Sequence, residues 1–143
     1  MIQRIQSILM LLAGGALGLE FIFPFASSSQ ASTGYFSDKA YNIFDNSILL
    51  GLISFGIFLS VIAIFLFKNR KLQTSVNWLT IILCFSILVA GYFFLSEDQS
   101  GIQSGTSVGI GSFLPLVSLI LLFLANRFIH KDERIVKSMD RLR

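Results

Sequence analysis

The chain has 143 residues, of which 54% are hydrophobic and 13% are charged, and its formal net charge is +3. Soluble domains carry charge on about a quarter of their residues, so this composition excludes an ordinary soluble domain. The basic residues flank apolar runs and are mixed with acids near the end of the chain, which argues against a nucleic-acid-binding surface. Anionic lipid is the more natural counterpart of the excess positive charge.

Four runs of the sequence are nearly free of charge, and each is long enough to cross a membrane as a helix. About 20 helical residues cover the roughly 30 Å hydrocarbon layer. The second run, ILLGLISFGIFLSVIAIFLF, is apolar on every side, whereas a buried soluble helix would show one polar stripe. We therefore expect an all-α integral membrane protein, an up-down bundle of four transmembrane helices at residues 5–25, 48–67, 76–95 and 112–129.

The first run also resembles a secretory signal peptide, because Arg4 precedes an apolar core and small residues follow it. The core is longer than usual for a signal peptide, so we expect it to stay as the first membrane helix. Gly14 and Gly18 in this run form a GxxxG pair, and Gly56 with Ser60 forms a similar pair in the second run. Such small residues let helices approach closely, here within one chain rather than between two chains.

Glu20 is the one acidic residue that we expect inside the membrane, about one turn from the outer end of the first helix. An ionisable group in a membrane span is costly to bury and is a functional candidate, as a proton relay or a cation site. Because the side chain is so near the interface, we also expect it to reach water, and this favours a purely structural role over the functional one.

The segments on the outward side are residues 26–47 and 96–111. Four aromatic residues of the first segment are expected at headgroup depth beside a short interfacial helix. They are Tyr35, Phe36, Tyr41 and Phe44. The second segment has four glycines and little to fold around, so we expect a mobile loop. Its GTSVGIG stretch lacks the Lys-Ser/Thr ending of a phosphate-binding loop, and we expect no nucleotide site.

Three single residues in or beside the third and fourth runs have ordinary structural interpretations. Cys84 lies mid-run without a second cysteine, and we expect an apolar filler. Trp78 is expected to be an interface anchor, and His130 an interfacial side chain rather than a metal ligand. No Ser-His-acid or HExxH pattern is present, so we expect no catalytic, cofactor-binding or metal site. We therefore expect that the protein is not an enzyme.

The chain ends in HKDERIVKSMDRLR, residues 130–143, which contains no helix breaker. We expect the fourth helix to run on as an amphipathic cytoplasmic tail whose apolar stripe contacts lipid or a partner protein. The residues assigned to this contact are Ile135, Val136, Met139, Leu142, Lys131, Arg134, Lys137 and Arg141. The alternative is that the charges serve only to orient the chain.

The basic residues also predict the orientation. Ten of the eleven Lys and Arg fall on one side of the four runs, and only Lys39 falls on the other. The positive-inside bias makes the richer side cytoplasmic, with both termini there. We therefore expect a multi-pass protein of the bacterial cytoplasmic (inner) membrane.

Three stretches carry a resemblance to a known family: MIQRIQS at 1–7, FKNRKLQ at 67–73 and IHKDERIVKSMDRLR at 129–143. The chain resembles the domain of unknown function 4293 family, small four-span membrane proteins found mainly in Bacteroidota. The resemblance implies a four-helix cytoplasmic-membrane protein. It brings no activity and no site residues with it.

We expect a non-enzymatic accessory or scaffolding subunit of an inner-membrane assembly, with the tail as its contact surface. Its partners would be membrane lipid and another membrane protein or complex, and a homo-oligomer is compatible with the sequence. The alternative is an oligomeric small-solute or ion channel or carrier with Glu20 near its outer mouth. The predicted helices are nearly free of polar residues near the midplane, which argues against a monomeric carrier.

Overall fold

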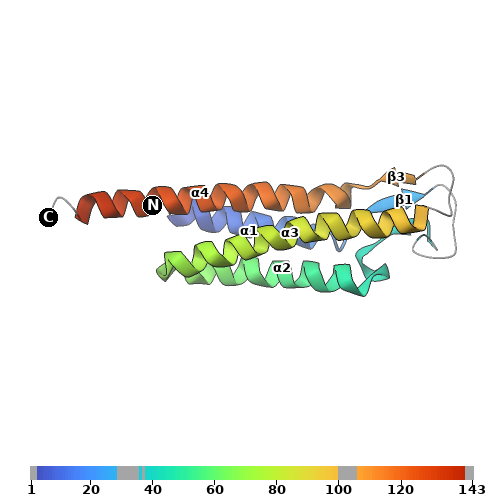
Figure 1. The fold of residues 1–143 in the computed structure, drawn as a ribbon, viewed down its shortest axis with the longest axis horizontal. Helices are drawn as coiled ribbons and strands as arrows, with labels where there is room; N and C mark the ends of the chain where they lie inside the picture. Colours follow the sequence, from blue (N-terminus) through green and yellow to red (C-terminus); the bar gives the residue numbers. More distant parts are fainter. Residues whose placement is uncertain (1–2, 29–35, 37, 100–105, 141–143) are drawn as a thin grey trace.

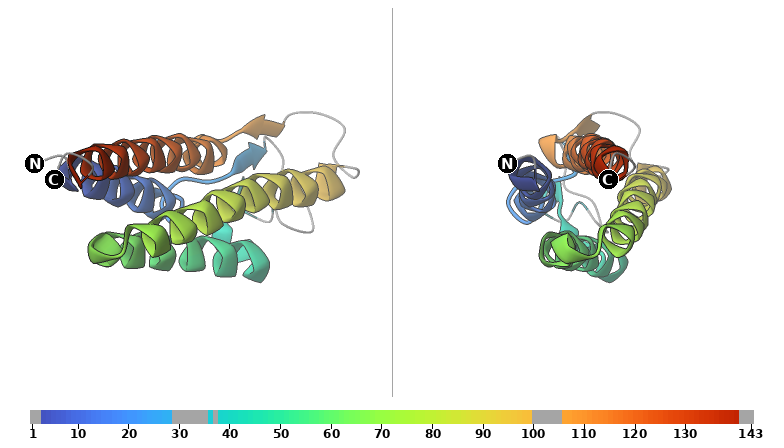
Figure 2. Two further views of the ribbon diagram at one scale, coloured as in Figure 1. Left: turned by 60° about the vertical axis from the view of Figure 1, so that its left-hand side comes forward. Right: turned by 90° about the vertical axis from the view of Figure 1, so that its left-hand side faces the viewer.

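The four long helices of the computed structural model form a ring in which consecutive helices run antiparallel (Figures 1 and 2). They are α1 (Gln3–Leu19), α2 (Ser47–Phe65), α3 (Arg70–Gln99) and α4 (Leu114–Asp140). Helices α1 and α3 each pack on both α2 and α4. The structure describes residues 3–28, 36, 38–99 and 106–140, with the side chains of 3–4, 97–99 and 136–140 left out.

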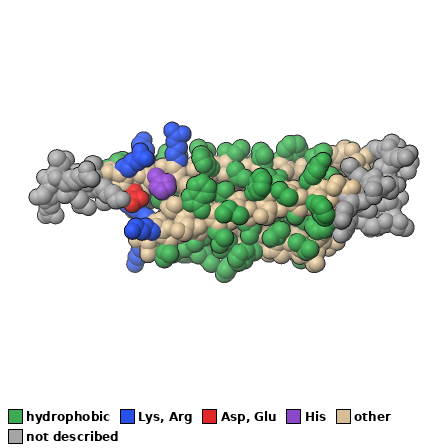
Figure 3. Space-filling model, viewed as in Figure 1, with side chains coloured by type: hydrophobic (Ala, Val, Ile, Leu, Met, Phe, Trp, Pro, Cys, Tyr) green, Lys and Arg blue, Asp and Glu red, His purple; other side chains and the backbone are tan. Residues whose placement is uncertain are grey.

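The outside of the bundle is strongly apolar (Figure 3). Among the described residues, three helical segments are long and apolar enough to cross a membrane, namely Ser47–Lys68, Arg70–Ser96 and Ile110–Ile135, and the apolar part of α1, Ile5–Leu19, is shorter. Only 33%, 28% and 33% of the most apolar windows of the three long segments are buried. The remaining apolar side chains face outward, where lipid rather than water is the solvent that suits them.

The two ends of the bundle differ in character. At one end, here called the basic end, lie Lys and Arg side chains of η2 (Leu66–Lys68), of the start of α3 and of the last third of α4 (Figure 3). The opposite end, here called the sheet end, carries three short strands: β1 (Ala26–Ser28), β2 (Ala40–Tyr41) and β3 (Thr106–Val108).

Helix α1 ends at Leu19, before the predicted boundary at Phe25. Pro24 explains part of this, since proline has no N–H for a helix and disfavours helical geometry in the preceding residue. Past Pro24 the chain turns into the sheet, where the Phe25 N–H donates to the Tyr41 carbonyl at 2.8 Å.

Strand β1 is the centre of the sheet, with β2 and β3 antiparallel on either side. Ala26 pairs with both Tyr41 and Val108, so the sheet joins the segment after α1 to the segment before α4. The sequence did not predict these strands.

The expectation of an aromatic belt in the first segment is wrong for two residues. Phe36 and Tyr41 are buried, with ring centroids 6.2 Å apart, and Phe25 also stacks edge-on against Tyr41. Phe44 is exposed, and Tyr35 lies outside the described residues. The described part of this segment contains a 3-10 turn, η1 (Ile43–Asp45), and no α-helix before α2.

The expectation of a mobile second segment is wrong for its last part, whereas residues 100–105 lie outside the described residues. Gly109 N–H donates to the Phe25 carbonyl at 2.8 Å, and Gly111 N–H to the Pro24 carbonyl at 3.0 Å. A Cβ on Gly109 would overlap the Pro24 carbonyl oxygen, so only glycine allows this approach of two backbones. The chain then enters η3 (Ile110–Phe113) and α4, with Pro115 in the first turn.

Small residues set the distance between α1, α2 and α3. A Cβ on Gly14 would lie 3.2 Å from the Cβ of Ser60, and one on Gly56 would lie 3.0 Å from Leu83 and 3.1 Å from Leu17. Gly18 faces open space. The expected packing within one chain is therefore found at Gly14, Gly56 and Ser60, but not at Gly18.

Helix α4 is longer than the bundle at the basic end (Figure 1). Asp132 of α4 contacts Gln6 of α1, and the two helices run antiparallel, so α4 passes the first described turn of α1 near Ile135. The backbone stays helical to Asp140, as expected from the absence of a helix breaker.

Candidate functional site

Polar side chains cross the interior of the bundle near the basic end, away from the midplane for which the sequence predicted few polar residues. Asn77 of α3 donates from Nδ2 to Oδ1 of Asn126 in α4 at 3.1 Å. Gln6 of α1 donates from Nε2 to Oδ2 of Asp132 in α4 at 2.6 Å. All four side chains are buried, so these bonds join three helices in an environment of low dielectric.

Two further bonds run from a side chain to the backbone of another helix. Gln73 Nε2 donates to the Ala63 carbonyl at 3.0 Å, and Ser118 Oγ donates to the Ala13 carbonyl at 2.8 Å. A hydrogen bond between helices in lipid adds on average about 0.6 kcal/mol, so these contacts favour one arrangement of the helices over others.

The sequence contained a signal for this interior face. Gln73, Asn77, Thr80 and Cys84 follow one another at steps of four, three and four residues, the spacing of one helix face, and all four are buried. The same spacing relates Ser118, Leu122, Ala125 and Ile129 on α4. Polar residues that recur on the same helix face as buried apolar residues therefore indicated the inside of the bundle rather than a surface exposed to water.

Some polar atoms inside the bundle have no hydrogen-bond partner among the described residues. They are both carboxylate oxygens of Glu20, Oγ of Ser60, Oδ1 of Asn77, Nδ2 of Asn126 and Oδ1 of Asp132. Buried groups of this kind are costly unless something satisfies them, so each is a place where water, a proton or a ligand atom would be stabilising.

Glu20 follows the last residue of α1 at the sheet end, and its side chain is only 2% exposed. The expectation that Glu20 reaches water is therefore wrong. Cys84 of α3 is near enough to the carboxylate to interact with it electrostatically, and Cys84 belongs to the main apolar core with Leu17, Leu49 and Ile53. The residues after Leu19 form turns, in which the Glu20 N–H donates to the Leu17 carbonyl at 3.2 Å.

A lone buried carboxyl group of this kind can hold a proton, because the neutral form is the cheaper one to keep in an apolar environment. A metal ion needs more ligands than this site offers. Among the residues that the structure describes, no three His, Cys, Asp or Glu side chains lie close enough together to bind one.

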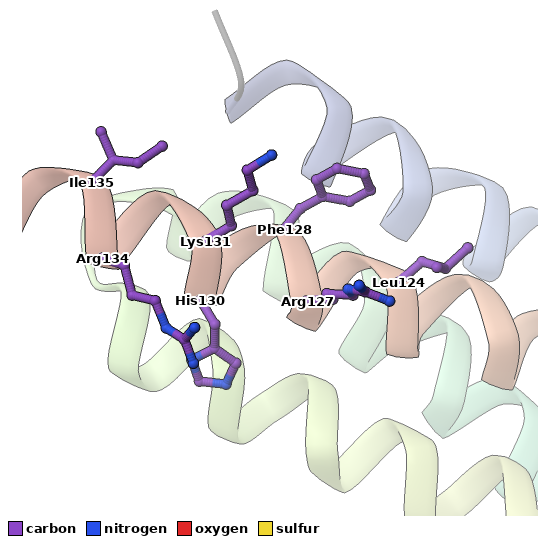
Figure 4. A pocket seen from close by; sticks show the side chains of 7 residues that line it. All are labelled: Leu124, Arg127, Phe128, His130, Lys131, Arg134 and Ile135. Atoms are coloured by element: carbon purple, nitrogen blue, oxygen red, sulfur yellow. The ribbon is translucent and has the colours of Figure 1, made fainter.

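A groove of about 930 Å³ runs along the outward face of α4 at the basic end (Figure 4). Its lining residues are Leu124, Arg127, Phe128, His130, Lys131, Arg134 and Ile135. They recur at three- and four-residue steps, so one helix face supplies the whole lining. Phe128 lies on the side nearer α1, and His130 and Arg134 point to the other side.

The groove contains three residues of the predicted tail contact, Lys131, Arg134 and Ile135, all of them exposed. For Val136, Lys137 and Met139 the structure gives the helical backbone, while their side chains, together with Arg141 and Leu142, lie outside the described residues. Arg127, which the sequence assigned only to orientation, joins the groove.

The sequence profile of the family described as a domain of unknown function (DUF4293) matches residues 2–142, which is essentially the whole chain. The chain belongs to the DUF4293 family. No curated protein and no solved structure is similar to it.

For this member of the DUF4293 family, both candidate sites fall within the matched residues: the carboxyl group of Glu20 and the basic groove on α4. The two sites lie at opposite ends of the bundle. They are therefore separate features, and each needs its own functional hypothesis.

Proposed function

We propose that this DUF4293 protein is a non-enzymatic accessory subunit of a larger membrane assembly, and that the projecting end of α4 contacts another membrane protein. The observation that carries the proposal is the length of α4, whose 27 residues continue as a helix to Asp140, past the hydrogen bonds that Asn126 and Asp132 make to α3 and α1. An amphipathic helix that extends past its neighbours can offer its apolar stripe to lipid or to a partner protein.

We further propose that all four helices cross the bacterial cytoplasmic membrane, with the basic end and both termini in the cytoplasm. Helix α1, with 17 residues, is about 26 Å long, slightly less than the hydrocarbon layer. The turn that follows it adds the missing length. The Lys and Arg side chains at one end of the bundle support this orientation through the positive-inside bias.

Copurification from native membranes tests the proposal. The tagged chain, extracted in mild detergent, should bring down a second membrane protein that mass spectrometry identifies. Val136→Asp places a charge on the predicted apolar stripe and should abolish the copurification. Ser138→Asp adds the same charge in the same helical turn at the border of the stripe, where the native residue is already polar, and should weaken the copurification less.

Two results would contradict the accessory role. One is a homogeneous oligomer of this chain with no other protein in it. The other is a partner that both aspartate variants retain equally, because the tail would then be no contact surface.

A second candidate function rests on Glu20, whose two carboxylate oxygens are buried without a hydrogen-bond partner. We propose as the alternative an oligomeric channel or carrier for a proton or small ion, with Glu20 near its outer mouth. Its test is proton or cation flux into vesicles that contain the purified protein. Glu20→Gln should abolish the flux, and the matched variant Asp45→Asn, an exposed acid at the same end, should not. Flux that survives Glu20→Gln would remove Glu20 from any pathway.

A further inference from the structure

The basic groove on α4 has two parallel edges of different chemistry. Viewed down the helix at 100° per residue, Leu124, Phe128 and Ile135 share one edge, and Arg127 and Arg134 share the other. The apolar edge adjoins α1, and Arg127 and Arg134 lie on the side of α3, as the pairs Asp132–Gln6 and Asn126–Asn77 establish for the two flanks of α4. Lys131 lies between them, with its side chain beside Phe128 (Figure 4). A ligand that fills the groove must therefore be anionic along one side and apolar along the other.

The positive charge in the groove is uncompensated. Within the parts of the chain that the structure describes, no carboxylate lies within ion-pair distance of Arg127, Lys131 or Arg134. The neighbouring acid Asp132 points into the bundle, where it accepts a hydrogen bond from Gln6. His130 differs, because its Nδ1 lies 3.9 Å from Oε2 of Glu133.

The position of the groove also matters. It begins at Leu124 within the apolar segment Ile110–Ile135 and ends where that segment ends. An amphiphile lying in the groove would have its hydrocarbon beside Leu124 and Phe128, and its head beside Arg127, Lys131 and Arg134. This is the order of groups in a lipid molecule at the boundary between hydrocarbon and headgroups.

From this arrangement we propose that the α4 groove is a binding site for an anionic phospholipid, whose phosphate group is bound by Arg127, Lys131 and Arg134. Guanidinium groups suit this role, since their N–H donors match two phosphate oxygens at once. The site requires only that α4 lies in a bilayer. It does not depend on which leaflet the basic end faces or on whether the tail binds a partner protein.

The test uses delipidated full-length protein in detergent, titrated with phosphatidylglycerol or with phosphatidylcholine and followed by native mass spectrometry. Each Lys or Arg near an anionic surface is worth about a fivefold change in affinity. The triple variant Arg127→Gln, Lys131→Gln, Arg134→Gln should therefore bind phosphatidylglycerol on the order of a hundredfold more weakly than the wild type. Its affinity for phosphatidylcholine should not change.

The chain offers a matched control at the same end of the bundle. The triple variant Lys68→Gln, Arg70→Gln, Lys71→Gln removes the same charge from η2 and the start of α3, outside the groove. This variant should keep an affinity for phosphatidylglycerol near that of the wild type. Circular dichroism of both variants must match the wild type, so that a loss of folding is not read as a loss of binding.

A second measurement locates the lipid. Trp78, the only tryptophan, packs edge-on against Phe123, the residue before Leu124. Brominated phosphatidylglycerol in vesicles should therefore quench Trp78 fluorescence more strongly than brominated phosphatidylcholine at equal mole fraction, and the groove variant should remove this difference.

Three outcomes would overturn the proposal. Equal affinity of the wild type for both lipids would show that no anion is selected, and equal losses in the two triple variants would show a response to net charge alone. The third is inorganic phosphate at millimolar concentration displacing phosphatidylglycerol, or binding as tightly in its absence. The ligand would then be a soluble phosphate rather than a lipid.

Discussion

The hydrogen-bonded pair between Asn77 and Asn126 gives the sharpest test of what holds the bundle together. Replacing Asn126 by Leu removes the one bond of the Asn77 amide and leaves a fully buried amide beside an apolar side chain. Replacing both residues by Leu removes the orphaned group as well. Both variants lose the same hydrogen bond. Only the single variant keeps an unpaired amide inside the bundle.

The magnitude follows from these contacts. The bond itself contributes about 0.6 kcal/mol, and at most about 1.7 kcal/mol, in a membrane interior. Leaving the Asn77 amide unpaired adds about 1–3 kcal/mol. We expect Asn126→Leu to lower the free energy of unfolding by about 2 kcal/mol, and Asn77→Leu by a similar amount. The double variant should lose less than either single variant, because Oδ1 of Asn77 and Nδ2 of Asn126 are unpartnered already.

Reversible unfolding in mixed micelles, with sodium dodecyl sulfate as the denaturant and circular dichroism as the signal, measures these free energies. Ser54→Leu is the control, since Ser54 is exposed on α2 and its replacement should change stability by less than about 0.5 kcal/mol. If the losses of the two single variants simply add in the double variant, the pair is not coupled and the reasoning fails. Stability unchanged in both single variants would refute it as well.

The remaining predictions concern packing and burial. Gly56→Leu should cost about 1–3 kcal/mol in the same assay, because its side chain would collide with α1 and α3, whereas Gly51→Leu faces open space and should cost nothing measurable. Equal costs would contradict the packing described for α2. Gly109→Ala should accelerate amide hydrogen exchange in the β1–β3 pair, since a Cβ would overlap the Pro24 carbonyl. Unchanged exchange would show that the backbone around Gly109 shifts to accept the methyl group without weakening the strand pair. Glu20 should react with the apolar reagent dicyclohexylcarbodiimide but not with a water-soluble carbodiimide, as peptide mass spectrometry would show, and equal labelling by both would mean that the carboxyl group is exposed.

The helices could be predicted because each signal is local. A long apolar run needs internal hydrogen bonds for its backbone in lipid, and a helix provides them. The continuation of α4 to Asp140 is equally local, because the last part of the chain has no proline or glycine to end a helix. These features required no knowledge of what any residue contacts.

The sheet and the buried polar groups could not be predicted in the same way, since they depend on residues far apart in the sequence. Ser27 of β1 pairs with Ser107 of β3, which is far away in the sequence. A three-residue strand contains too little sequence to predict which other strand it pairs with. Phe36 and Tyr41 looked like residues for a membrane interface because the sheet to which Tyr41 belongs was unknown. Glu20 was expected to reach water because of its place near the end of the first run, which says nothing of the side chains packed around it.

The central position of β1 has a consequence for the order in which the molecule is completed. One edge of β1 pairs with β2, which the ribosome makes soon afterwards, but the other edge pairs with β3, which follows only after α2 and α3. A chain halted after α2 would have its first helical hairpin and an open strand edge at the same time. The pairing of β3 with β1 therefore completes the sheet late in synthesis, and a protein divided between α2 and α3 would have to rejoin its halves both through the helix contacts α1–α4 and α2–α3 and through this strand pair.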